Sequence, residues 1–154
     1  MQAMSNEIRL TARLVDSLYV EAMVLADEVR SYFDETGRIE REALPPLERV
    51  AFSCESLKVT TRLMHVIAWL LTRRAVEHGE ISAAQARAPS RRLGLAADSD
   101  SDTLAMLPET ARALIDASRD LYARVERLDQ DLDLPIMPVP SPALGLLDRL
   151  ERAF

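Results

Sequence analysis

Glycine is scarce in this chain and never occurs in pairs, and this feature constrains the fold more than any other. Four glycines stand among 154 residues, at positions 37, 79, 94 and 145. Sandwiches and barrels need many tight turns, which are built from Gly, Asn and Pro. Asn occurs only at position 6. The shortage of turn residues therefore argues against a sheet-rich fold and predicts an all-α protein.

Glycines and prolines divide the chain into three long stretches. We expect helices over about residues 5–36, 46–78 and 104–131, because Gly37 and Gly79 are typical C-terminal signals and Pro46 suits a first helical turn. These helices predict an antiparallel three-helix bundle over residues 1–132. Half of the eight prolines lie between residues 135 and 142. They predict a flexible, Pro-rich tail over residues 133–154 that contains a short amphipathic segment.

The first and third stretches each carry one apolar stripe, as expected for helices packed on one side. The spacing in the third stretch alternates between four and three residues, which is a heptad seam. The stripe of the first stretch comprises Leu14, Val15, Leu18, Ala22, Leu25, Val29, Tyr32 and Phe33. The seam of the third comprises Leu107, Ala111, Leu114, Ser118, Leu121, Val125, Leu128 and Leu132.

The middle of the second helix is apolar on every side. Between Leu63 and Leu71 eight of nine residues are apolar, and His65 is the exception. A helix of this kind contacts protein on more than one side. This segment is therefore either the centre of the bundle or also part of an interface between subunits. Because a three-helix bundle leaves part of each helix exposed, we expect a homodimer with the following side chains at the interface: Leu63, Val66, Ile67, Trp69 and Leu70.

Residues 80–102 form a long connection between the second and third helices. A connection of this length in a small bundle is either functional or mobile. We expect a short helical turn over residues 81–86. From Asp98 to Asp102 the connection alternates Asp and Ser but lacks the Gly and closing Glu of a calcium loop, so we interpret it as solvated linker.

The net charge and the single cysteine limit which partners and which cellular compartment are expected. The net charge is −6, whereas a protein that binds nucleic acid normally carries a basic face. No run of 18 apolar residues is present, which argues against membrane insertion. Cys54 stands alone, so no internal disulfide forms, and this suits a reducing compartment. We expect a soluble cytoplasmic protein that binds no nucleic acid.

The residues that carry catalysis or bind metals are not assembled in any recognisable pattern. Cys54 and His65 would lie on one helix face but about 16 Å apart, too far for proton transfer. The chain has two histidines, without the repeated ligand spacing of a metal site on helices. Its isolated glycines do not form a phosphate-binding loop. We therefore predict no enzyme activity, no cofactor and no metal.

Polar residues crowd the second helix, although Ser and Thr are mediocre helix formers. One interpretation is small-residue packing where helices approach closely. The other is a surface that recognises proteins. On the second interpretation the candidate protein-binding residues are Glu55, Lys58, Thr61, Arg62, Arg73, Arg74 and Glu80.

A run on the second helix carries a family resemblance. Residues 53–71 read SCESLKVTTRLMHVIAWLL, and shorter matching runs lie at residues 19–23, 30–32, 74–76 and 79–82. This part of the chain, about residues 15–95, resembles the alphaproteobacterial RcdA family, the regulators of CtrA degradation. The third helix and the tail share only length and pattern with that family.

The resemblance implies a dimer of small three-helix bundles without enzymatic activity. It implies an adaptor of the cell cycle that helps deliver CtrA and other cargo to the ClpXP protease by tethering. Partners implied in the same way are a response-regulator adaptor and an effector that binds cyclic di-GMP. Two other functions stay open from the residues alone. One is a structural scaffold dimer with no role in proteolysis, and the other is a regulator that binds a small ligand at the apolar part of the second helix.

Overall fold

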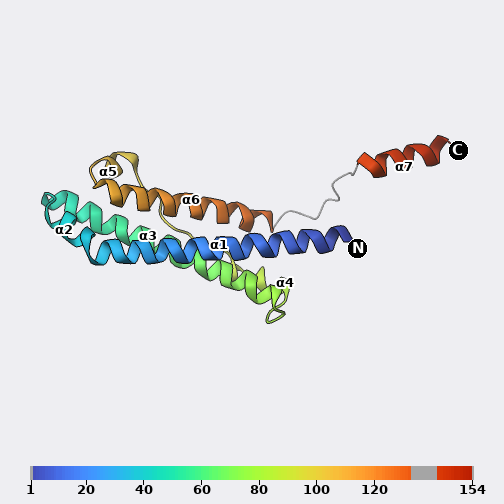
Figure 1. The fold of residues 1–154 in the computed structure, drawn as a ribbon, viewed down its shortest axis with the longest axis horizontal. Coiled ribbons are helices and arrows are strands. Elements are labelled where there is room, and N and C mark those ends of the chain that lie inside the picture. The colour runs from blue at the N-terminus through green and yellow to red at the C-terminus, as the bar shows by residue number, and fades with distance from the viewer. Residues whose placement is uncertain (1, 133–141, 154) are drawn as a thin grey trace.

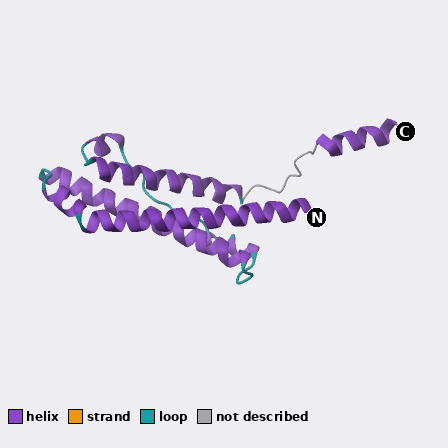
Figure 2. Cartoon of the chain, in the orientation of Figure 1, coloured by secondary structure: helices purple, strands orange, loops and turns teal. Residues whose placement is uncertain are grey.

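The computed structural model describes residues 2–132 and 142–153, and the regular structure within these ranges is helical throughout (Figure 2). The long helices are α1 (Gln2–Asp34), α3 (Pro46–Glu77) and α6 (Glu109–Asp131). The shorter elements are α2 (Thr36–Glu42), α4 (Ala83–Ala86), the 3₁₀ turn η1 (Pro89–Arg91), α5 (Ser101–Ala105) and α7 (Pro142–Ala153). The all-α prediction is confirmed.

Helix α3 packs against α1 and also against α6 (Figure 1). Its two-sided apolar character is therefore largely explained by contacts within one chain. The three long helices share a core of buried side chains, together with two residues from the segment before α6. These are Val15, Leu18, Ala22, Leu25, Val29, Tyr32, Phe52, Val59, Leu63, Val66, Trp69, Leu70, Leu104, Leu107, Ala111, Leu114, Ile115, Leu121 and Val125.

Helices α3 and α6 run in the same direction, which corrects the predicted antiparallel bundle. Arg62 contacts Ser118 and Trp69 contacts Asp129, so residue numbers rise together along the two helices. Helix α1 runs opposite to both (Figure 1). The physical reason is the long connection, because a parallel pair of helices requires the chain to travel back before the second helix begins.

Residues 92–100 make this return journey, and we call them the return strap. Helix α3 has 32 residues, which is about 48 Å at helical rise. The return strap runs back along it: Gly94 lies against His65, and Ser99 reaches Glu55, ten residues earlier on α3. The interpretation of residues 98–102 as solvated linker is therefore only partly right, because Asp98, Asp100, Ser101 and Asp102 are exposed but the segment also holds a buried residue and the start of α5. Ser99 is buried, and Asp100 accepts a hydrogen bond from the Asp102 N–H as the N-cap of α5.

The first helix ends differently from the prediction. Helix α1 ends at Asp34, and Gly37 lies inside α2 rather than terminating a helix. A Cβ atom at Gly37 would lie 2.7 Å from the Tyr32 carbonyl oxygen, so glycine allows a close backbone approach there. Gly79 has φ 72°, the left-handed conformation expected after the C-terminus of a helix. The signal at Gly79 is thus confirmed, and the end of α3 lies within one residue of the prediction.

The third predicted helix is divided in two by Pro108. Helix α5 ends at Ala105 and α6 begins at Glu109, because proline disfavours helical conformation in the residue before it. The heptad seam itself is confirmed. Its members are buried from Leu107 through Val125, and Leu128 and Leu132 pack partly against the core.

The tail is only partly within the described residues. Residues 133–141, which carry much of the predicted flexible segment, lie outside them. Helix α7 has 12 residues, more than the short amphipathic segment expected, and Figure 1 shows it apart from the other helices. Within residues 2–132 and 142–153, no helix combines the length and the apolar character that crossing a membrane requires.

Candidate functional site

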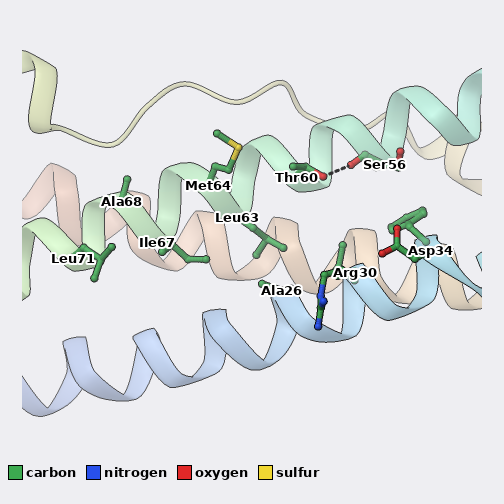
Figure 3. Close-up of a pocket in the computed structure, with 12 residues that line it drawn as sticks. Ala26, Arg30, Asp34, Ser56, Thr60, Leu63, Met64, Ile67, Ala68 and Leu71 are labelled. Carbon is green, nitrogen blue, oxygen red and sulfur yellow. Dashed lines mark hydrogen bonds between the residues drawn. The ribbon is translucent and has the colours of Figure 1, made fainter.

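An apolar groove lies between α1 and α3, with a volume of about 580 Å³ (Figure 3). We call it the α1–α3 groove. Helix α3 forms one wall and α1 the other, and Leu63 and Ile67 point from α3 toward α1. The groove is lined by Ala26, Val29, Arg30, Phe33, Asp34, Ser56, Thr60, Leu63, Met64, Ile67, Ala68 and Leu71.

The rim of the α1–α3 groove exposes large apolar side chains. Met64 is 63% exposed and Leu71 47% exposed, although both belong to the most apolar part of the chain. The hydroxyls of Ser56 and Thr60 donate to the carbonyl oxygens of Ser53 and Ser56 within α3, at 2.8 and 3.0 Å. Their donor groups are therefore satisfied internally, and the groove presents mainly hydrocarbon to whatever occupies it.

The opposite face of α3 holds a buried polar network centred on Arg62. Its guanidinium donates to Ser118 Oγ at 3.2 Å, to the Ala97 carbonyl oxygen at 2.9 Å and to Ser99 Oγ at 2.6 Å. Ser99 Oγ in turn donates to Glu55 Oε2. Burial lowers the pKa of Arg62, while the charge of Glu55 acts against this shift. The network joins α3, α6 and the return strap through side chains that are almost fully buried.

Two further groups hold the same end of the return strap. Lys58 Nζ donates to Glu55 Oε1 at 2.9 Å and to the Asp98 carbonyl oxygen at 3.2 Å. Arg119 donates to the Asp98 carboxylate at 2.8 Å. This hydrogen bond from Arg119, with one from the Ser99 N–H, lowers the pKa of Asp98.

Asp129 holds the other end of the return strap. It accepts hydrogen bonds from Trp69 Nε1 at 2.9 Å, from Arg92 Nε at 2.8 Å and from the Leu93 N–H at 3.4 Å. Burial acts to raise the pKa of Asp129, but these hydrogen bonds outweigh it, and the pKa lies below the usual range. Between the two ends, Tyr122 Oη donates to the Gly94 carbonyl oxygen at 2.7 Å.

The structure separates the predicted protein-binding residues into two groups. Glu55 and Arg62 are each 2% exposed and serve the interior network, so neither presents its charge to a partner. That part of the prediction is corrected, because loop residues far along the chain cover both side chains. Accessible positions are held by Lys58, Thr61, Arg73, Arg74 and Glu80, which stay predicted binding residues.

Four of the predicted interface residues lie in the core of the single chain. Leu63, Val66, Trp69 and Leu70 are buried against α1 and α6, which leaves no surface there for a second subunit. Ile67 differs, because it is only partly buried and lines the α1–α3 groove. The sequence placed exposed apolar surface at Leu63, Val66, Trp69 and Leu70. In the structure the apolar side chains that remain accessible on this part of α3 are instead Met64, Ile67 and Leu71.

Ser99, Ser118 and Asp129 were missed as partners of the second helix. Ser118 occupies a seam position otherwise held by apolar residues, and this polar exception was the one available signal. Asp129 and Ser99 gave none, because their partners lie more than thirty residues away. Cys54 is exposed and has no partner to activate it among the hydrogen bonds of the described residues. Within residues 2–132 and 142–153 no cluster of three His, Cys, Asp or Glu residues is placed to hold a metal ion.

Comparison with known proteins identifies the family of this chain and a solved structure that is similar to it. A family model described as "Protein of unknown function (DUF1465)" matches residues 6–154. No curated protein matches the chain. Among solved structures the chain is similar to RcdA from Caulobacter crescentus CB15, with 34% identity and a TM-score of 0.64. The likeness covers 77% of this chain and 90% of the RcdA chain, and it supports the resemblance to the RcdA family.

Proposed function

Because this chain belongs to the family described as DUF1465 and is RcdA-like in sequence and fold, we propose that it is a non-enzymatic adaptor of regulated proteolysis. It promotes degradation of the response regulator CtrA, and of other cargo, by the ClpXP protease. It acts with a response-regulator adaptor and an effector that binds cyclic di-GMP. The observation that carries the proposal is the likeness to RcdA, the regulator of CtrA degradation, over most of both chains.

The mechanism is tethering. An adaptor that binds cargo and protease together raises the effective concentration of cargo at the protease without making or breaking bonds. The accessible polar residues Lys58, Thr61, Arg73, Arg74 and Glu80 are the proposed contacts for these partners. The return strap is hydrogen-bonded to α3 at one end and to α6 at the other, and helices held together in this way suit such a role.

The α1–α3 groove belongs to self-association in this proposal. A second copy of the chain covers Met64, Ile67 and Leu71, so that the working unit is a homodimer. An apolar surface of this kind, rimmed by polar residues such as Arg30 and Asp34, is typical of protein interfaces.

A reconstituted degradation assay tests the function. Purified ClpXP, CtrA and the two partner regulators are mixed with and without this chain, and the half-life of CtrA is measured. The proposal expects a shorter half-life when the chain is present. An unchanged half-life, with the chain folded and in excess, would contradict it and favour a scaffold dimer without a role in proteolysis.

A small-ligand regulator remains the second candidate, because the volume and apolar lining of the α1–α3 groove suit a drug-sized molecule. A panel of nucleotides and metabolites distinguishes the two. A ligand that binds the folded chain raises its melting temperature with concentration, whereas an adaptor shows this effect only with protein partners.

A further inference from the structure

Four arginines gather where the chain turns back after α3. Arg73 lies near the end of α3, Arg87 follows α4, Arg91 ends η1, and Arg92 begins the return strap. We call this group the arginine corner. The pKa of Arg73 is lowered by burial first and then by the positive charges of Arg87 and Arg92, so both of these cations lie within electrostatic reach of Arg73.

The acidic groups at the arginine corner do not balance its positive charge. Asp129 is committed to Arg92 and to Trp69 through hydrogen bonds. Glu77 and Asp129 are the carboxylates that act on Arg73. In the described part of the chain no side-chain hydrogen bond or ion pair engages Arg87 or Arg91. An excess of positive charge therefore persists at one corner of a protein whose net charge is −6.

The site also contains an unused donor and a cavity. Arg73 Nη2 is buried without a hydrogen-bond partner, whereas buried polar groups are normally paired. A cavity of about 440 Å³ lies between α3 and the connecting segment, and Trp69, whose ring lies under the Arg73 guanidinium, forms part of its wall. Its walls are His65, Ala68, Trp69, Thr72, Ser90, Arg91, Arg92 and Gly94.

The chemistry of these groups favours carboxylates. Guanidinium groups present paired N–H donors that match a carboxylate, and Ser90 adds a hydroxyl at the cavity wall, whereas the Thr72 hydroxyl already donates to the Ala68 carbonyl oxygen. Helix α1, which packs against α3, lies in a stretch of opposite charge, because residues 1–36 carry a net charge of −4 from seven acids and three arginines. A long polyanion such as a nucleic acid would extend over repelling surface, whereas a few residues of acidic peptide would not.

We propose that the arginine corner binds a short acidic segment of a partner protein. Carboxylates of the segment pair with Arg87 and Arg91 at the surface, and one of them reaches the buried Nη2 of Arg73. The inference rests on one part of the proposed function, namely that the chain acts by binding partner proteins. Binding itself is measurable without any protease.

Trp69 provides the readout. It is the only tryptophan of the chain, it lines the cavity, and the Arg73 guanidinium carbon lies 5.8 Å from its ring centroid. The full chain is titrated with a short peptide of alternating Asp and Glu that carries a fluorescent label. Anisotropy of the label and emission of Trp69 are followed together. The expected result is saturable binding that weakens with added salt and a parallel change in Trp69 emission.

Matched variants locate the binding. Arg87→Glu with Arg91→Glu should weaken binding by roughly tenfold or more, because two charge-assisted contacts are replaced by repulsion. The control is Arg38→Glu with Arg112→Glu, which makes the same charge change at exposed residues of α2 and α6, at the end of the molecule away from α4 (Figure 1). The control should bind the peptide nearly as well as the unaltered chain, and far-ultraviolet circular dichroism checks that both variants are folded.

Several outcomes would overturn the proposal. These are equal binding of an Asn and Gln peptide, equal losses in the two charge variants, or tighter binding of single-stranded DNA than of the acidic peptide. Peptide binding without any effect of the chain on CtrA half-life would leave the site standing and remove the proposed function. Faster CtrA degradation with no peptide binding would do the reverse.

Discussion

The guanidinium of Arg62 donates a hydrogen bond to Ser99 Oγ at 2.6 Å, across 37 residues of sequence. This contact lies at the far end of the return strap, where the chain has travelled back along α3 before α6 begins. Arg62 therefore helps to hold α3 and α6 in their parallel arrangement. Because Arg62 also donates to Ser118 on α6, one residue joins all three parts.

Replacing Arg62 should destabilise the chain more than any surface arginine does. Arg62→Met removes the buried donor to Ser99, Ser118 and the Ala97 carbonyl oxygen, and Lys58 remains as a cation bonded to Glu55. Breaking a buried charged network in this way typically costs about 3 kcal/mol. The free energy of unfolding from urea titration should fall by this amount, and amide exchange should quicken in residues 92–100. Arg127→Met, at an exposed position on α6, is the control and should change stability by less than about 0.5 kcal/mol. Equal effects of the two variants would remove Arg62 from this role.

Asp129 should make the return strap sensitive to acid. Its pKa in the folded chain is lowered, so its stabilising contribution is complete above the ordinary Asp pKa of about 3.9 and is lost as pH falls through the lower folded value. Emission of Trp69, which donates to Asp129, should therefore change only below about pH 4. Arg92→Gln removes the charged donors that lower this pKa and should move the transition to higher pH. A transition that stays in place in this variant would contradict the assignment.

Gly94 should not tolerate a side chain. A Cβ atom there would lie 2.7 Å from His65 Nδ1, which is shorter than the van der Waals distance between the two atoms and would be a steric clash. Gly94→Ala should lower the free energy of unfolding by about 1–3 kcal/mol, because the strap must move away from α3. The clash disappears when the ring is also removed, so Gly94→Ala should cost much less in a His65→Ala background. A double-mutant cycle by thermal melting measures this, and additive losses would show that the two residues do not meet.

Self-association should depend on the rim of the α1–α3 groove. Met64→Glu with Leu71→Glu places two charges on the surface proposed to meet a second copy, and sedimentation velocity should then detect a monomer. Both side chains are largely exposed in the single chain, so its circular dichroism should be unaltered. Leu47→Glu with Leu95→Glu is the matched control, because Leu47 is 86% and Leu95 91% exposed outside the groove, and this variant should associate like the unaltered chain. If the unaltered chain is already monomeric at micromolar concentration, the proposed dimer is contradicted.

The sequence by itself determined the local elements. The scarcity of glycine, the apolar stripe of α1 and the heptad seam of α6 all depend on neighbours within a few residues, and the matching helices are present. The same holds for Pro46 at the start of α3 and for Gly79 after its end. The RcdA-like run at residues 53–71 also pointed to the family whose fold the chain shares.

Only the tertiary structure decided how those helices are connected and which of their polar residues remain accessible. The direction of α6 depends on the course of residues 92–100, whose contacts with α3 and α6 join residues up to 44 positions apart. No local pattern encodes such contacts. For this reason the sequence suggested that Glu55 and Arg62 lie on the surface of α3, whereas both are buried and hold the return strap through hydrogen bonds. Met64 and Leu71, which belong to the stretch that is apolar on every side, form the rim of a groove, because α1 and α6 cover other sides of α3.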